Sequence, residues 1–285
     1  MEPTHTPDVD FGTHAHDVEA GDLLRSPVTE QIAAELPVPP GAVAADVGCG
    51  AGGMTLQLAE RVGPAGRVLA VDREAVLLDR VRERARANGV ADRVHTVRAG
   101  IDDLPAALPA PAALVWAGHV VHHVGDQAAA VRRLAGALEP GGLLAIAEGG
   151  VPPQWLPWDV GVGRPGIEAR LVAAQTEWFG AMRAGLPGSV RDPRGWSAVL
   201  RGAGLVDVTS RAWLLHVPAP LSAAQLAAVL HGLANRVERA QPWLSGEDVD
   251  AWARLLDEGG PDWLGRREDL EGTVVEVVQL GRRPA

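Results

Sequence analysis

The chain has 285 residues, 47% of them hydrophobic and 22% charged, which is typical of a soluble globular protein with one large domain or one domain and a cap. Its formal net charge is −10 and all 26 basic residues are arginines, so neither DNA nor RNA is an expected partner. No apolar run approaches the ~20 residues that cross a bilayer. The polar, histidine-rich residues 1–17 do not resemble a signal peptide, and we expect a cytoplasmic protein that binds no membrane.

The first half of the chain begins with a predicted helix over residues 15–36, which Pro27 must kink or split. Strands and helices then alternate, which predicts a parallel sheet covered on both faces. We expect strands at 43–47, 67–71, 93–98, 112–116 and 142–147, and helices at 54–62, 74–88 and 126–138. The run Pro140-Gly141-Gly142 is expected to be the turn before the last of these strands.

After residue 148 the pattern changes and eight of the nine tryptophans appear, within residues 155–263. The expected elements are helices at 166–184, 192–203, 221–240 and from the Ser245 cap onward, with strands at 205–210, continuing toward 217, and at 273–280. The predicted organisation is an N-terminal helical lid (1–40), a cofactor-binding core (41–148), a cap insertion (149–190), and the rest of the core sheet (191–285) with a helical insertion at 218–270.

The run Gly48-Cys49-Gly50-Ala51-Gly52-Gly53 follows the first predicted strand and precedes a helix. Without side chains, such a turn lets a ligand approach the backbone closely. The next strand ends at Asp72, whose carboxylate can accept hydrogen bonds from both hydroxyls of a ribose. These features predict a cofactor that contains a nucleoside. The hexapeptide alone also fits the pattern of NAD and FAD enzymes, and Cys49 is explained as a small residue that fills the turn.

Two further features carry a family resemblance. Asp46 precedes the first glycine, giving D-x-G-x-G, and a strand at 273–280 closes the chain. With the runs at 23–27 and 119–124, they resemble the class I S-adenosylmethionine-dependent methyltransferases, in particular bacterial members that act on small molecules. The resemblance implies a doubly wound, mostly parallel, Rossmann-like sheet of seven strands. Its last strand would be antiparallel, and the insertions would form a helical, tryptophan-rich cap.

The resemblance also implies that the cofactor is S-adenosyl-L-methionine and that S-adenosyl-L-homocysteine is a product. Asp46 and the backbone of the first glycines would hold the amino-acid end, Asp72 the ribose, and Arg73 would lie beside the adenine. Gly100 stands where the family has an acid, so the Ile101 backbone and Asp102 are the expected substitutes. The complete expected set is Asp46, Gly48, Cys49, Gly50, Asp72, Arg73, Ile101, Asp102, Trp116 and Ala117.

Three histidines follow the fourth predicted strand, near the position of the reacting sulfur in this family. His119 is nearest the strand end and is the first candidate for a catalytic base, with His123 second. The pair His122 and His123 is equally explained by packing and hydrogen bonding. No spacing of histidines and carboxylates predicts a metal site.

The acceptor is expected to be a small, apolar or aromatic hydroxylated metabolite, methylated on oxygen, with carbon or nitrogen as alternatives. His14, Trp155, Trp158 and Trp178 are candidates to contact it, although the tryptophans are also explained as anchors of the cap helices. Two other functions remain open: a protein of this fold that uses the cofactor for a non-methylating reaction or for structure, and an NAD-dependent oxidoreductase. Reductases that use a Tyr/Lys pair are excluded because the chain has neither residue. A homodimer is compatible with the sequence.

Overall fold

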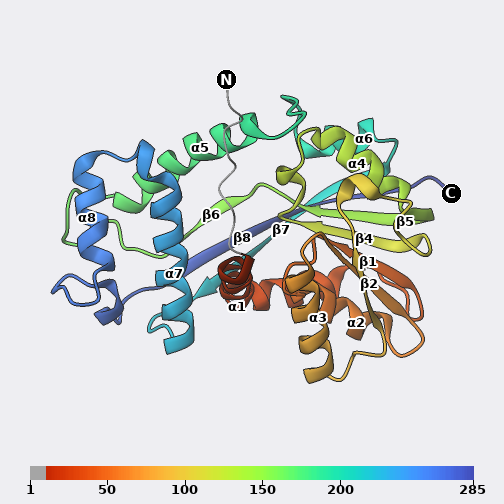
Figure 1. Cartoon of the computed structure of the whole chain (residues 1–285), viewed down its shortest axis with the longest axis horizontal. Helices are drawn as coiled ribbons and strands as arrows, with labels where there is room; N and C mark the ends of the chain where they lie inside the picture. Colours follow the sequence, from red (N-terminus) through yellow and green to blue (C-terminus); the bar gives the residue numbers. More distant parts are fainter. Residues whose placement is uncertain (1–10) are drawn as a thin grey trace.

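The computed structural model describes residues 11–285, with side chains described from residue 18 onward. One mixed sheet of eight strands runs through the molecule (Figure 1). The hydrogen-bonded order is β3 (Val94–Arg98), β2 (Arg67–Asp72), β1 (Val43–Val47), β4 (Ala112–Gly118), β5 (Leu138–Ala147), β8 (Gly272–Arg282) and β6 (Val151–Gln154), while β7 (Val206–Val217) also pairs with β8. The first five strands are parallel and β8 is antiparallel, which confirms the predicted fold class.

Strand β6 is the one strand that the sequence did not predict. It extends the line of β5 along the same edge of β8, because β5 pairs with the second half of β8 and β6 with the first half. Its sequence, Val-Pro-Pro-Gln, contains two prolines, which lack the N–H that a strand ladder uses. The segment 149–190 therefore contributes to the sheet as well as to the cap.

Helices α1 (Phe11–Glu35), α2 (Gly53–Val62) and α3 (Ala75–Ala87) cover one face of the sheet, and α4 (Gln127–Gly136) and α6 (Trp196–Gly202) cover the other. The alternation of β1 shows the two layers, since Ala44 packs into the first core and Ala45 into the second. Pro27 does not split α1. Burial of Val28 and Ile32 on the core side holds the helix together beyond it.

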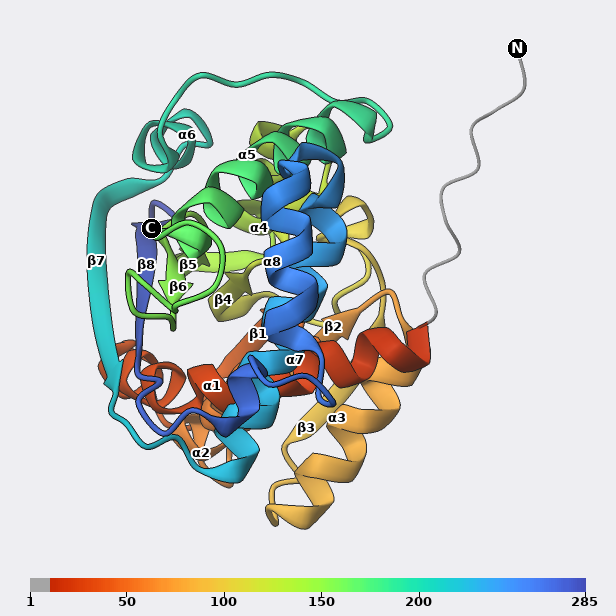
Figure 2. The ribbon, with the colours of Figure 1, turned by 90° about the vertical axis from the view of Figure 1, so that its left-hand side faces the viewer.

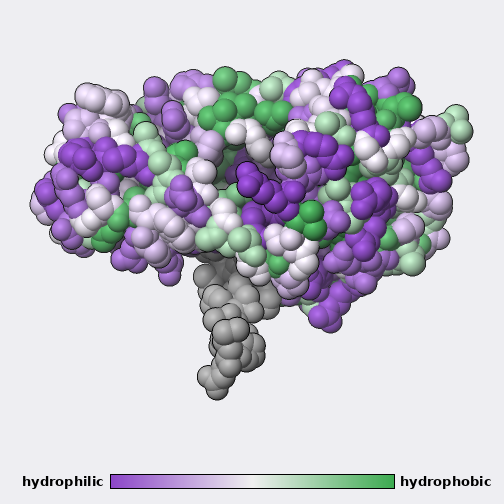
Figure 3. All heavy atoms as spheres, turned by 90° about the horizontal axis from the view of Figure 1, so that it is seen from above, coloured by the Kyte–Doolittle hydropathy of each residue, from purple (hydrophilic) through white to green (hydrophobic). Residues whose placement is uncertain are grey.

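The cap consists of α5 (Ile167–Gly185), α7 (Ala223–Ala240) and α8 (Gly246–Leu256), and α7 packs against α1, α5 and α8 (Figure 2). A capping box at Ser222 begins α7, and the Ser245 side chain caps the start of α8. Both starts lie where the sequence predicts a helix to begin. Short 3-10 turns are η1 (Ile101–Asp103), η2 (Val121–His123), η3 (Gln241–Trp243) and η4 (Leu264–Arg266). Seen from above, the surface is hollowed between the cap and the sheet half (Figure 3).

Most predicted boundaries differ from the structure by two residues or fewer, and the larger differences are at the starts of α1, which begins at Phe11 rather than at 15, of β5 and of α6. The run Pro140-Gly141-Gly142 lies inside β5, in an irregularity where Leu138 pairs with Ala112 and Leu143 with Leu114. Helix α6 begins at Trp196 rather than at 192, because Pro193 and Gly195 disfavour an earlier start.

A substitution at Gly272, the first residue of β8, tests the packing of β8 against Trp155, which directly follows β6. A Cβ there would lie 2.1 Å from the ring of Trp155. We expect Gly272→Ala to lower the free energy of unfolding by about 1–3 kcal/mol, because the buried ring must move. The measurement is urea unfolding followed by circular dichroism. Gly180→Ala, in α5 with nothing within 4 Å of its Cβ, is the control and should be neutral or stabilising. Equal stability of the two variants would contradict this packing.

Candidate active site

The glycine-rich loop between β1 and α2 requires its glycines for conformation and for space. Gly48, Gly50 and Gly52 have φ of 71°, 53° and 88°, which is the left-handed region. A Cβ on Gly48 would lie 2.3 Å from Val120, and one on Gly50 would lie 3.0 Å from Val18 of α1. The loop is therefore packed closely between the segment after β4 and helix α1.

Asp72 connects this loop with the next helix. One carboxylate oxygen accepts a hydrogen bond from the Gly50 N–H at 3.1 Å, and the other accepts from the Glu74 N–H at 3.0 Å, just before α3. A carboxylate has about four lone-pair sites, so it can accept further hydrogen bonds. Asp72 thus lies where the sequence places it, at the carboxyl end of β2 and beside the glycine loop.

Asp46 is buried, with 2% of its surface exposed. Its carboxylate accepts a hydrogen bond from the Thr55 hydroxyl in α2 at 2.6 Å. Burial raises the pKa of Asp46 to about 7, with the Thr55 hydrogen bond opposing and the nearby Asp22 and Asp72 adding to the rise. In this structure Asp46 ties β1 to α2, and its expected contact with the cofactor stays a prediction.

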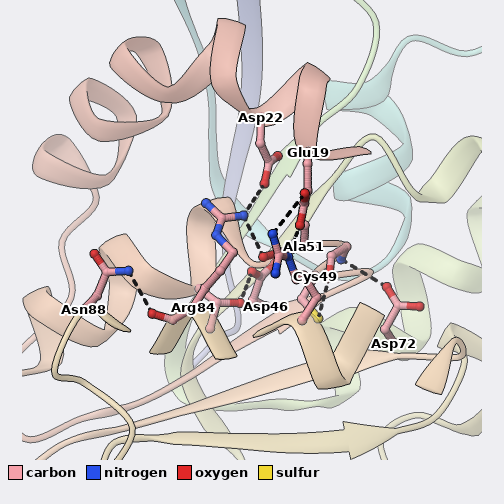
Figure 4. A network of polar contacts seen from close by, with 11 residues as sticks. Glu19, Asp22, Asp46, Cys49, Ala51, Asp72, Arg84 and Asn88 are labelled. Atoms are coloured by element: carbon pink, nitrogen blue, oxygen red, sulfur yellow. Dashed lines mark hydrogen bonds and ion pairs between the residues drawn. The ribbon is translucent and has the colours of Figure 1, made fainter. Parts of the chain in front are cut away.

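Helix α1 lies directly on the loop (Figure 4). Asp22 lies beside Gly53 and accepts a hydrogen bond from Arg84 of α3 at 2.9 Å, while Arg84 also donates to the Ala51 carbonyl at 2.7 Å. Glu19, one turn earlier, pairs with Arg80 of α3. These two ion pairs hold α1 across the glycine loop.

The other expected cofactor residues occupy different environments. Trp116 pairs in register with Asp46 on the α1 side of the sheet, whereas Ala117 packs into the core on the α4 side. Arg73 is exposed and its side chain lies near Gly100, 3.3 Å from where a Cβ on that glycine would stand. Burial raises the pKa of the Cys49 thiol, which is expected of a small residue packed into the turn.

The segment after β3 shows a local capping arrangement. Ile101 is buried at the start of η1, and the exposed Asp102 forms an ion pair with Arg133 of α4 at 3.2 Å. The carboxylate of Asp103 accepts a hydrogen bond from the Gly100 N–H at 2.7 Å. The role expected of Ile101 and Asp102 toward the adenine therefore remains a prediction.

His119 leaves the end of β4 in a left-handed conformation, with φ of 54°. Its Nε2 lies 3.0 Å from a carboxylate oxygen of Glu276, which stands in the middle of β8. The other oxygen of Glu276 accepts a hydrogen bond from Arg25 of α1 at 3.1 Å. Burial raises the pKa of Glu276, but the bonds and charges of His119 and Arg25 outweigh it, so the pKa lies below the ordinary value and the carboxylate is ionised.

Sequence reasoning missed Glu276 because 157 positions separate it from His119. One signal was present: Glu276 is a lone acid in the run Val274-Val275-Glu276-Val277-Val278. A carboxylate on the buried face of a strand requires a partner, and here the partners come from β4 and α1.

His122 is a structural residue. Its Nδ1 lies 2.8 Å from Glu148, and the other oxygen of that buried carboxylate accepts hydrogen bonds from the N–H groups of Val121 and His122. His123 is exposed, with its ring centroid 4.1 Å from that of His122. Arg183 of α5 donates to the carbonyls of residues 122, 124 and 125, which fixes this segment to the cap.

A cavity of about 210 Å³ lies between α1, β6, β8 and α7. Trp155 lines it, and Arg239, which also lines it, stands 5.7 Å from the centre of the Trp178 ring. Trp158 does not line it and is 76% exposed on the surface. The His14 side chain lies outside the described residues. Of the four expected acceptor contacts, the structure thus brings Trp155 to this cavity and Trp178 next to it.

Comparison with known proteins identifies the family. A family model described as a methyltransferase domain matches residues 44–142. The chain is 35% identical over 135 residues to the methyltransferase GfsG of Streptomyces halstedii, covering 46% of this chain and 44% of that protein. It is 30% identical over 195 residues to the nocamycin O-methyltransferase of Saccharothrix syringae, covering 65% and 66%. The matched region therefore spans less than half of the Streptomyces protein and about two thirds of the Saccharothrix protein.

Solved structures agree on the fold. The YcgJ protein of Bacillus subtilis superimposes with a TM-score of 0.54 at 17% identity, covering 90% of this chain and 98% of that one. An O-methyltransferase family protein from Burkholderia thailandensis gives 0.53 at 15% identity, covering 94% and 58%. Sequence motif, sheet order and these matches together show that the chain belongs to the class I S-adenosylmethionine-dependent methyltransferases.

Two further features are absent from residues 11–285. In that range no group of three or more histidine, cysteine or acidic side chains is arranged to hold a metal ion. No helix there is long and apolar enough to cross a membrane.

Because Asp46 is buried and its pKa is raised, we expect the free energy of unfolding to depend on pH. Asp46 binds its proton more tightly in the folded protein, with a pKa of about 7, than in the unfolded chain, with 3.8, so the free energy of unfolding falls as the pH rises between these values. Asp46→Asn cannot titrate and keeps an oxygen for Thr55. We expect its stability relative to the parent protein to rise by roughly 2–3 kcal/mol between pH 5 and pH 8.

Urea unfolding at several pH values measures this difference. Asp250→Asn, at an exposed position of α8, is the control and should parallel the parent protein at every pH. A parallel profile for Asp46→Asn as well would show that the Asp46 carboxyl is already ionised at acidic pH in the folded state.

Proposed function

We propose that this protein transfers a methyl group from S-adenosyl-L-methionine to a hydroxyl oxygen of a small, partly apolar acceptor. The observation that carries the proposal is the pair of His119 and Glu276 beside the glycine loop. Val120 follows His119 and packs on Gly48, so the imidazole lies next to the segment that would hold the cofactor.

The residues present fit the cofactor chemically. The carboxylate of Asp72 stands at the strand end with acceptor capacity for ribose hydroxyls, and Gly48, Gly50 and Gly52 add no side chain of their own to the loop. When bound, S-adenosyl-L-methionine supplies an electrophilic methyl group on a sulfonium. Val18 and Asp22 of α1 lie on the loop, so α1 would act as the cover of this site and exclude water from it.

His119 would act as the general base. Because the ionised Glu276 only accepts hydrogen bonds, a neutral His119 donates its Nε2–H to that carboxylate and keeps Nδ1 as the proton acceptor. Nδ1 would take the hydroxyl proton as the acceptor oxygen forms its bond to the methyl carbon and the carbon–sulfur bond of the sulfonium breaks, which would leave S-adenosyl-L-homocysteine. The carboxylate orients the ring and stabilises the imidazolium that results.

The names of relatives support an oxygen acceptor, since the Saccharothrix protein is called a nocamycin O-methyltransferase. The family assignment favours methyl transfer over an NAD-dependent oxidoreductase. Use of the cofactor without methyl transfer remains the second candidate, and a search for labelled product separates the two functions.

One test of this function concerns the cofactor. Asp72→Asn removes the charge that would hold the ribose while keeping an acceptor oxygen for a backbone N–H. We expect its affinity for S-adenosylhomocysteine to fall about 10- to 100-fold, the loss typical of hydrogen bonds to a charged group. Isothermal calorimetry measures it, with Asp79→Asn on the exposed face of α3 as the control. Binding of NAD in place of S-adenosylhomocysteine would contradict the proposal.

Another test of this function concerns His119 as the base. With 2-naphthol and 6-hydroxy-2-naphthoate as acceptors, His119→Asn should lower kcat by about 10²- to 10⁴-fold. Glu276→Gln should lower kcat less and leave the affinity for S-adenosylhomocysteine unchanged, because it acts through His119. Transfer of label from methyl-labelled cofactor is measured, and His216→Asn, on the exposed part of β7, is the control. Full activity of His119→Asn would exclude this histidine as the base.

A further inference from the structure

We propose that the cavity between α1, β6, β8 and α7 binds a carboxylate of the acceptor, so that the substrates are compact apolar hydroxy acids. Arg236 of α7 would hold the carboxylate, and the hydroxyl would point toward His119. This inference rests on the proposed function and specifies its substrate class.

Arg236 is a partly buried cation, and its Nη2 makes no hydrogen bond to the described residues. Its Nε donates to Gln175 at 3.0 Å, and Nη1 donates to Glu168 at 3.1 Å and to the Pro153 carbonyl at 3.3 Å. Its Nη2 is buried and has no hydrogen-bond partner among the residues that the structure describes. An unsatisfied donor on a charged group is costly, and a rotation of the guanidinium that turned Nη2 toward a ligand oxygen in the cavity would remove that cost.

Glu168 compensates this cation only in part. One of its oxygens accepts the N–H groups of Trp155 and Leu156, each at 2.9 Å, so its charge is shared with two backbone donors. Burial lowers the pKa of Arg236 despite the opposing charge and hydrogen bond of Glu168. A second anion next to the guanidinium would therefore be favourable, and the cavity is the open space beside it.

Arginines and apolar side chains line the cavity, and two of these arginines, Arg25 and Arg236, already pair with Glu276 and Glu168. Three arginines line it, Arg25, Arg236 and Arg239, and no acidic residue is among its described lining residues, although the protein carries a net charge of −10. Leu24, Trp155 and Val274 supply apolar surface. Such a lining fits an apolar body with one anionic group. The volume of about 210 Å³ is below the ~300 Å³ at which pockets for drug-sized ligands begin, which favours a compact acceptor.

The position of the cavity sets the orientation of the acceptor. Arg25 at its α1 wall donates to Glu276, and Glu276 bonds His119. Val274 in the floor lies two residues before Glu276 on the same face of β8. Glu276 and His119 do not line the cavity themselves, but Arg25 and Val274 connect its lining to that pair, while Arg236 lies on α7. A carboxylate at Arg236 would leave a hydroxyl at the opposite end of the molecule facing His119.

Three probes with one ring system test the proposal. 6-Hydroxy-2-naphthoate carries a carboxylate opposite its hydroxyl, 2-naphthol lacks the carboxylate, and 6-hydroxy-2-naphthamide is its neutral counterpart. With S-adenosylhomocysteine present, calorimetry should show that the protein binds the naphthoate about 10- to 100-fold more tightly than either neutral probe. Equal binding of the three probes, or no binding of the naphthoate, would overturn the proposal.

Variants assign the preference to Arg236. Arg236→Gln should reduce the preference for the naphthoate to about threefold or less while binding of 2-naphthol changes little, and Arg236→Lys should retain part of it. Arg201→Gln, on the exposed side of α6, should keep the full preference. Thermal unfolding and S-adenosylhomocysteine binding show whether Arg236→Gln is folded, and Arg236→Lys provides the test if it is not. A folded Arg236→Gln that keeps the full preference for the naphthoate would exclude Arg236 as the carboxylate ligand. An Arg236→Lys variant that loses none of this preference would exclude it as well.

Failure of this inference differs from failure of the proposed function. If S-adenosylhomocysteine binds and label is transferred to 2-naphthol as readily as to the naphthoate, methyl transfer stands and the carboxylate preference is wrong. If the naphthoate binds through Arg236 but no label is transferred to it, the cavity is an acid-binding site and the methyl-transfer function is wrong.

Discussion

A buried carboxylate with two partners from distant parts of the chain is the interaction on which the site depends. Glu276 lies in the middle of β8, bonded to Arg25 from α1 and to His119 from the end of β4. An ionised group in such a place is tolerated only when it is paired, so the fold must bring all three segments together. The same contact that satisfies the charge fixes the imidazole beside the glycine loop. Stability and the placement of the proposed base are thereby consequences of one arrangement.

The two proposed ligand regions, the glycine loop with Asp72 and the cavity, differ in how they are built. The glycine loop and Asp72 come from short, local connections between neighbouring parallel strands, and their geometry follows from backbone conformation. The cavity is assembled from the N-terminal helix, the strands that close the sheet and the cap helix α7, which are far apart in sequence. If the loop holds the cofactor and the cavity the acceptor, as proposed, the acceptor side could change through its insertions while the loop stays the same.

Much of the fold could be predicted because its signals are local. Alternating apolar strands and amphipathic helices indicated the parallel sheet, and Ser245 marked the start of a helix. Strand β6 could not be predicted, because its two prolines oppose strand formation and only pairing with β8 supports it. Asp72 and the glycine loop follow from a motif, whereas Glu276 and Arg236 acquire their roles from partners 157 and 68 positions away. Contacts of this kind leave no periodic pattern in the sequence.

Helix α1 forms part of both ligand regions. Val18 and Asp22 rest on the glycine loop, and Gly21, Leu24 and Arg25 line the cavity. If α1 moves to admit a molecule at the glycine loop, the same movement changes the shape of the cavity. Binding at the glycine loop and binding in the cavity would then be thermodynamically linked. If a ligand at one region changes the affinity of the other region by some factor, the second ligand changes the affinity of the first region by the same factor.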